Sequence, residues 1–169
     1  FGYDRREHPK FANQAYAGYA LARVNRAPLG TLRALYDNER KNSLTGLPLV
    51  HLGVALSLQG DKARGAKAIA EGFARDAADR PDYLGDYGSR LRDGALMIAL
   101  VHGHKLAKPE VDARAVALGK ELDVRRSRAW FWLSTQEQVA IARLGKALMA
   151  DQGRQVSGEW KVGDATCGG

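Results

Sequence analysis

Apolar residues recur at spacings of three and four along most of the chain, whereas alternating runs of β-branched residues are scarce. Such spacing places apolar side chains on one face of a helix, so it predicts helices rather than a sheet. The predicted helices cover residues 11–25, 31–40, 45–58, 62–79, 89–102, 109–124 and 134–151. The fold class that follows is all-α, built of helical hairpins.

Polar residues mark several of the predicted helix starts. Asp61 follows Gly60 in a tight turn, and its carboxylate can accept the free amide hydrogens of the next helix. Ser89 has the same position before a later helix. Ser134 and Glu137 form a capping box, in which each side chain bonds the backbone amide of the other. These starts are therefore predicted from local chemistry. We expect the glycines mostly to end helices.

The helix pairs begin near residues 11, 45, 89 and 134, at intervals of about 34, 44 and 45 residues. A tetratricopeptide array would keep an interval of ~34 residues, so the spacing favours an α/α toroid or an irregular solenoid. After Gly153 the pattern changes, because residues 155–162 alternate like a short strand. We predict a helical domain over 1–152 and an extended tail over 153–169, either the start of a following domain or an appended stretch.

Composition adds few constraints to this picture. With 169 residues, of which 45% are apolar, the chain is long enough for one domain with its own core. No apolar run reaches the ~18–20 uncharged residues of a membrane span, so we expect no direct membrane contact. The single cysteine, Cys167, cannot form an internal disulfide and leaves the redox compartment open.

The net charge of +7 would suggest an anionic partner if the charge were gathered on one face. The densest cluster, RRSR at 125–128, falls at a predicted helix end, where cations interact favourably with the helix dipole. We interpret it as a solvated helix end and expect no nucleic-acid partner. Trp130 and Trp132 follow these arginines closely enough to keep a nucleic-acid site open as the alternative.

Four segments of the chain have distinctive residue patterns: YGSRLRDGAL at 87–96, LSTQE at 133–137, LGTLRALY at 29–36 and LSLQGDKAR at 56–64. The first resembles the YGS-x-LRD-x-A segment of bacterial alpha-2-macroglobulins, and the second resembles one of that family's helix starts. LGTLRALY at 29–36 is similar to its LG-x-LRYLYD turn, and LSLQGDKAR at 56–64 to its AL-x-x-LGD-x-x-R hairpin. Together they span roughly residues 15–150. The resemblance implies the C-terminal part of the thioester-containing domain, over 1–152.

The resemblance also implies a function. In this family six helical hairpins form an α/α toroid, of which this chain would supply somewhat more than half. The parent would be a large multidomain protein of the periplasm, anchored to the inner membrane, which traps attacking proteases. Its partners would be target proteases and its own other domains. This stretch would serve as a structural and target-binding scaffold, without being an enzyme.

In that family, cleavage of a bait region exposes an internal Cys–Gln thioester to a nucleophile, but its Cys-x-Glu-Gln motif is absent here. Cys167 is followed by two glycines. The TQEQ stretch at 135–138 imitates the motif with threonine, and we interpret it as the capping box already described. We expect the motif upstream of Phe1, unless the parent belongs to the branch that lacks a thioester.

The histidines offer weak alternatives. His102 and His104, with Glu110 or Asp112, could begin a zinc site, but two ligands do not make one, and a mobile loop pair is favoured. We expect His51 to make a local hydrogen bond and His8 to lie in a charged N-terminal segment. No nucleophile elbow or phosphate-binding glycine motif occurs. We therefore predict no catalytic, cofactor-binding or metal-binding residues.

Two further groups bear on competing functions. An α/α-toroid enzyme would need an acidic cluster, and the close pairs Asp76/Asp79 and Asp82/Asp86 fall at a helix end and in a turn. A helical-repeat scaffold for a peptide or another protein is the other alternative. Five aromatic residues could form a contact surface on one rim, although we favour their closing the toroid's ends: Tyr83, Tyr87, Trp130, Phe131 and Trp132.

Overall fold

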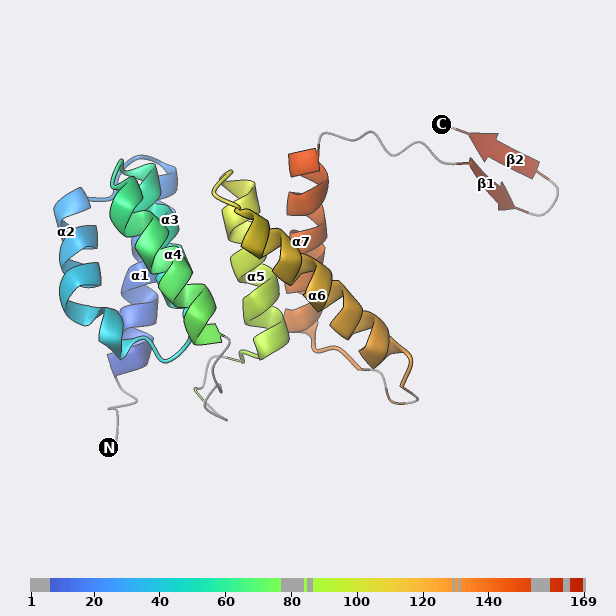
Figure 1. Cartoon of the computed structure of the whole chain (residues 1–169), viewed down its shortest axis with the longest axis horizontal. Helices are drawn as coiled ribbons and strands as arrows, with labels where there is room; N and C mark the ends of the chain where they lie inside the picture. The colour runs from blue at the N-terminus through green and yellow to red at the C-terminus, as the bar shows by residue number, and fades with distance from the viewer. Residues whose placement is uncertain are drawn as a thin grey trace.

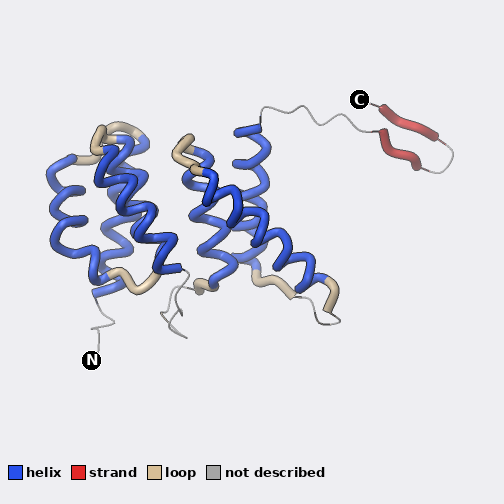
Figure 2. The backbone as a smooth tube through the Cα atoms, in the orientation of Figure 1, coloured by secondary structure: helices blue, strands red, loops and turns tan. Residues whose placement is uncertain are grey.

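The computed structural model describes residues 7–76, 84, 87–128, 130, 132–152, 159–162 and 165–168. Its helices are α1 (Glu7–Arg23), α2 (Leu29–Ala34), α3 (Gly46–Leu58), α4 (Lys62–Asp76), α5 (Arg90–Gly103), α6 (Pro109–Arg126) and α7 (Thr135–Gln152) (Figure 1). Every predicted helix has a counterpart, and short loops join most of them (Figure 2). The predicted all-α class is confirmed.

The second predicted helix differs from the expectation. Instead of one α-helix over 31–40, α2 passes into a π-helical turn, Leu35–Glu39, and a 3-10 turn, Arg40–Asn42. Tyr36 in the π turn is buried, and its hydroxyl donates to Glu71 Oε1 on α4 at 2.7 Å. Burial and this hydrogen bond raise the pKa of Tyr36 to about 12. The irregular turn is therefore held by a contact that local spacing does not reveal.

Alternate helices form two layers. α1, α3, α5 and α7 make a row in which each helix packs on the next, while α4 and α6 lie across the row on the viewer's side of Figure 1. α3 contacts α4 most extensively, and α5 contacts α6 as well as α7. This alternation is the arrangement of an arc of an α/α toroid.

The core is organised around α3, which is buried on opposite faces. Leu49, Leu52 and Leu56 on one face pack into a cluster with α1 and α2, together with Phe11 and Leu32. On the other face Leu47, Val50 and Val54 pack into a second cluster with α4, α5, α6 and α7. Because a helix that is apolar all round must be covered all round, α3 can form only inside this array.

Glycines bring α3 and α4 close together. A Cβ on Gly53 would lie 2.8 Å from the carbonyl oxygen of Gly65, and one on Gly65 would lie 2.7 Å from that of Gly53. Gly46 and Gly72 face each other in the same way further along the pair. The expectation that glycines mostly end helices is therefore wrong for these four, which lie at a helix–helix contact and leave no room for a side chain.

The turn between α3 and α4 follows the prediction. Gly60 adopts a φ of 94°, and Asp61 Oδ1 accepts the amide hydrogen of Arg64 at 3.2 Å, as a capping residue does. Asp61 Oδ2 also accepts a hydrogen bond from Arg33 Nε at 2.6 Å. The hydrogen bonds from Arg33 and Arg64 outweigh the effect of burial and lower the pKa of Asp61. The cap of α4 thereby also attaches α2.

The tail contains two short antiparallel strands, β1 (Glu159–Val162) and β2 (Ala165–Gly168), with Trp160 opposite Cys167. β1 confirms the strand expected within 155–162. None of the helices that the structure describes is both long and apolar enough to cross a membrane.

Candidate functional site

The two segments with the most distinctive motifs meet where α5 and α7 begin. Ser89 Oγ accepts the amide hydrogen of Arg92 at 3.1 Å and donates to Glu137 Oε1 at 2.7 Å. Glu137 Oε2 accepts the amide of Ser134 at 2.9 Å, while Ser134 Oγ accepts the amide of Glu137 at 3.2 Å. Both predicted caps are confirmed, and they share one carboxylate. We call Ser89, Ser134 and Glu137 the cap junction.

Glu137 is well suited to hold this junction. Its side chain is buried, which by itself raises the pKa, but the hydrogen bonds from Ser89 and Ser134 prevail and lower it. The group is thus an ionised acceptor surrounded by donors. Gln138, the last residue of the TQEQ stretch, donates through Nε2 to the carbonyl oxygen of Leu133 at 3.0 Å. This geometry supports the interpretation of that stretch as a helix start.

The LRD part of the YGSRLRD segment, at 91–93, is structural as well. Leu91 and Asp93 are buried, and Arg92 Nη2 lies 2.6 Å from Asp93 Oδ1. An ion pair of this kind keeps the buried carboxylate compensated. The segment therefore fixes the first turn of α5 rather than presenting reactive groups.

Three of the five predicted aromatic residues lie within the described chain, and all three are exposed. Tyr87 is 88% exposed, Trp130 95% and Trp132 80%. Tyr87 and Trp132 each lie two residues before a serine of the cap junction, so their chain segments share one end of the helical row. These three rings face solvent instead of packing into the helical row, and their closing the ends of a complete toroid stays a prediction. Tyr83 and Phe131 lie outside the described residues.

The arginine cluster lies where the sequence predicted. α6 ends at Arg126, and Arg125 Nη2 pairs with Glu121 Oε1 one turn earlier at 2.6 Å. Part of the local charge is therefore compensated within the helix. Of the acidic pairs, Asp76 is the last residue of α4, whereas Asp79, Asp82 and Asp86 lie outside the described residues.

His102 and His104 diverge instead of converging on a metal. His102 is buried in the last turn of α5, with Nε2 3.1 Å from Asp112 Oδ1 on α6. His104 Nε2 lies 3.0 Å from the hydroxyl of Tyr19 on α1. The expectation of a loop pair is wrong for His102, which lies within α5 and faces α6, whereas His104 directly follows α5 and contacts α1. Among the described residues, no three potential ligands from His, Cys, Asp and Glu gather in one place.

The other two histidines are also packed. His8 is buried in the first turn of α1, where its Nδ1 accepts the amide hydrogen of Leu44 at 3.1 Å. It therefore belongs to the packed helix and not to a charged N-terminal segment outside it. The His51 ring lies 5.2 Å from that of Tyr16 and 5.3 Å from that of Tyr19. Burial, with a smaller effect of Arg92, lowers the pKa of His51 to about 4.

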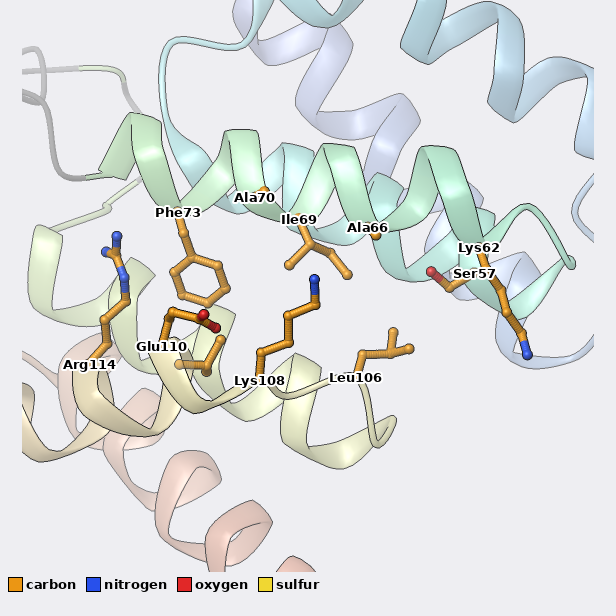
Figure 3. A pocket seen from close by; sticks show the side chains of 11 residues that line it. Ser57, Lys62, Ala66, Ile69, Ala70, Phe73, Leu106, Lys108, Glu110 and Arg114 are labelled. Carbon is orange, nitrogen blue, oxygen red and sulfur yellow. The ribbon is translucent and has the colours of Figure 1, made fainter.

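A cleft of about 510 Å³, which sequence reasoning missed, opens between α4 and α6. Ile69 and Phe73 project into it from α4, and Lys108 points in from the loop before α6 (Figure 3). The Arg114 guanidinium lies 5.2 Å from the centre of the Phe73 ring. The sequence pattern that could have indicated the cleft is a stripe along α4, at residues 62, 66, 69, 70 and 73. Such a stripe looks the same as the core-facing side of a helix.

The chain is similar to known proteins over nearly its whole length, although no family model matches it. The alpha-2-macroglobulin of Xylella fastidiosa strain 9a5c is 63% identical over 163 residues, which are 96% of this chain and 10% of that protein. The alpha-2-macroglobulin of Escherichia coli K12 is 38% identical over 160 residues, 94% of this chain and 9% of that protein.

The solved structures that resemble this chain are also bacterial alpha-2-macroglobulins. The Salmonella alpha-2-macroglobulin reacted with methylamine matches with a TM-score of 0.75 and 34% identity, over 98% of this chain and 10% of that one. Trypsin-activated alpha-2-macroglobulin from E. coli matches with a TM-score of 0.72 and 36% identity, over 98% and 11%. The chain spans about a tenth of the length of these relatives. It is therefore homologous to one segment of the bacterial alpha-2-macroglobulin family, the family that its motifs predicted.

Proposed function

We propose that this chain is the C-terminal part of the thioester-containing domain of a bacterial alpha-2-macroglobulin-like protease inhibitor. The observation that carries the proposal is the 63% identity to the Xylella protein over 96% of this chain. The arc of alternating helix layers and the meeting of two family-like segments at the cap junction support it. In this role the chain is a scaffold that positions neighbouring parts of the parent.

The chemistry of trapping would then lie outside these 169 residues, which contain no Cys-x-Glu-Gln motif. The methylamine-reacted Salmonella relative points to an acyl group that amines can attack. In the proposed reaction a protease lysine amine attacks the thioester carbonyl carbon. The new amide bond forms as the carbon–sulfur bond breaks, the sulfur leaves as a thiolate, and the nitrogen loses its proton to solvent. Burial from water would protect the thioester until activation.

Relatives from E. coli are described as activated by trypsin or by porcine elastase. We propose proteases of this kind as the parent's targets, and the other domains of the same polypeptide as the chain's permanent neighbours. The proposed location is the periplasm, with an inner-membrane anchor elsewhere in the parent. The chain itself is proposed to have no enzymatic activity and to need no cofactor.

The test uses the full parent polypeptide incubated with trypsin. We expect trypsin to keep its activity on a small chromogenic peptide, to lose most of its activity on casein, and to migrate with the parent under denaturing conditions. Pretreatment with methylamine should release one thiol per molecule and abolish the covalent product. Protection of casein without thiol release would favour the branch that lacks a thioester. Undiminished casein cleavage would overturn the proposal.

A further inference from the structure

The cleft between α4 and α6 has an apolar interior. Ile69, Phe73 and Val111 line it and are each less than 10% exposed. Ala66 and Ala70 line α4 beside them with small side chains, which leave space for an incoming group. The volume of about 510 Å³ falls within the range of ~300–1,000 Å³ usual for binding pockets. An apolar side chain of an incoming group would fit against these residues.

The mouth of the cleft is positively charged. Lys62, Lys108 and Arg114 line it, against a single carboxylate, Glu110. Lys108 is exposed and directed into the opening (Figure 3). Carboxylates placed next to an apolar group would therefore meet opposite charges, whereas a basic or purely apolar group would leave the cations without partners.

We propose that this cleft docks a segment of the same parent polypeptide, in which a large apolar side chain is flanked by carboxylates. The inference rests on the proposed function, because it requires the chain to be part of a longer protein. The chain spans about a tenth of its relatives, so about nine-tenths of such a polypeptide lies outside it and can supply the segment. The apolar side chain rests against Ile69 and Phe73, while its carboxylates pair with Lys108 and Arg114.

The experiment places a diazirine amino acid at Ala66 in the intact parent, followed by irradiation, digestion and mass spectrometry. The matched control carries the same group at Ala113, which is exposed on α6 and does not line the cleft. We expect Ala66 to crosslink within the molecule to one segment that has a large apolar residue and at least two acidic neighbours. The Ala113 probe should not reach that segment.

Charge reversal gives the second part of the test. The double variant Lys108→Glu/Arg114→Glu should lower the yield of that crosslink by about tenfold, whereas Lys120→Glu, on α6 outside the cleft, should change it less than twofold. Circular dichroism checks that each variant is folded. Crosslinks to a separate polypeptide, no crosslink, or a yield that ignores charge reversal would each overturn the docking proposal.

The two proposals fail separately. A parent that traps trypsin but gives no crosslink at Ala66 overturns only the docking of a segment in the cleft. A parent that gives the crosslink but leaves casein cleavage undiminished overturns only the protease-trapping function.

Discussion

Ser89 donates a hydrogen bond of 2.7 Å to the carboxylate of Glu137, which lies 48 residues later in the chain. Through this bond the cap of α5 shares a carboxylate with the cap of α7. A substitution of Glu137 should therefore weaken the starts of both helices. α5 and α7 also pack on each other along their lengths. The cap junction therefore sets how the last two helices of the row begin together.

Replacing Glu137 with alanine removes the acceptor shared by Ser89 and Ser134. We expect the free energy of unfolding to fall by about 1–3 kcal/mol, because the half-buried donors of Ser89 and Ser134 lose their partner. Urea denaturation followed by circular dichroism measures the loss. Gln136→Ala, an exposed position one residue earlier, is the control and should change stability by less than about 0.5 kcal/mol. Equal effects of the two substitutions would show that the junction contributes nothing specific.

The half-buried imidazole of His51 makes the stability of the protein dependent on pH. Its pKa is lowered to about 4 in the folded state, from 6.5, so protons bind more readily to the unfolded chain. Its contribution is therefore fully present above pH 6.5 and is lost as the pH falls through 4. Between these limits stability should decline by about 1–3 kcal/mol.

His51→Phe keeps a ring against Tyr16 and Tyr19 but removes the titration. In urea denaturation between pH 7 and pH 4.5, the variant should lose less stability than the wild type. Part of the decline should remain, because burial also lowers the pKa of His104. Parallel curves of stability against pH for the wild type and the variant would count against a neutral His51 in the folded protein.

Replacing glycine with alanine should have opposite effects on stability at the contact between α3 and α4 and at an open position of α7. Gly53→Ala should destabilise the protein by about 1–3 kcal/mol, since its methyl group would meet the Gly65 carbonyl in a packed contact. Gly145→Ala in α7 adds a methyl with nothing within 4 Å and should stabilise it by about 0.5–1 kcal/mol. Thermal unfolding of both variants checks this, and a neutral Gly53→Ala would refute the close approach.

The exposed aromatic residues provide a test of the outward orientation. Trp130→Ser and Trp132→Ser should each change the stability of this chain by less than about 0.5 kcal/mol. In a Trp160→Phe background, which leaves Trp130 and Trp132 as the two tryptophans, the fluorescence should be strongly quenched by iodide, because both of these indoles are exposed. A loss of several kcal/mol in either variant would instead restore the interpretation that these rings fill the end of the helical row.

The starts of α4, α5 and α7 could be predicted because Asp61, Ser89 and Ser134 act on amides within their own first turns. Contacts between residues that are far apart in the sequence could not be predicted in this way. The bond from Ser89 to Glu137 and the Gly53 and Gly65 contact depend on how helices lie beside one another, which spacing along one helix does not encode. The outward orientation of Trp130 has the same cause, since an aromatic run fits both a core and a surface. The cleft was missed because its lining comes from separate elements.

The position of α3 has a consequence for how the molecule opens. Its two apolar faces supply both clusters of the core, so the loss of either cluster would expose one apolar face of α3 to water. The backbone amides of α3 should therefore exchange with deuterated water only when the whole helical array unfolds, whereas those at the free end of α6 should exchange through local fraying. We therefore expect the two halves of the row to unfold as one cooperative unit, joined by the helix between them.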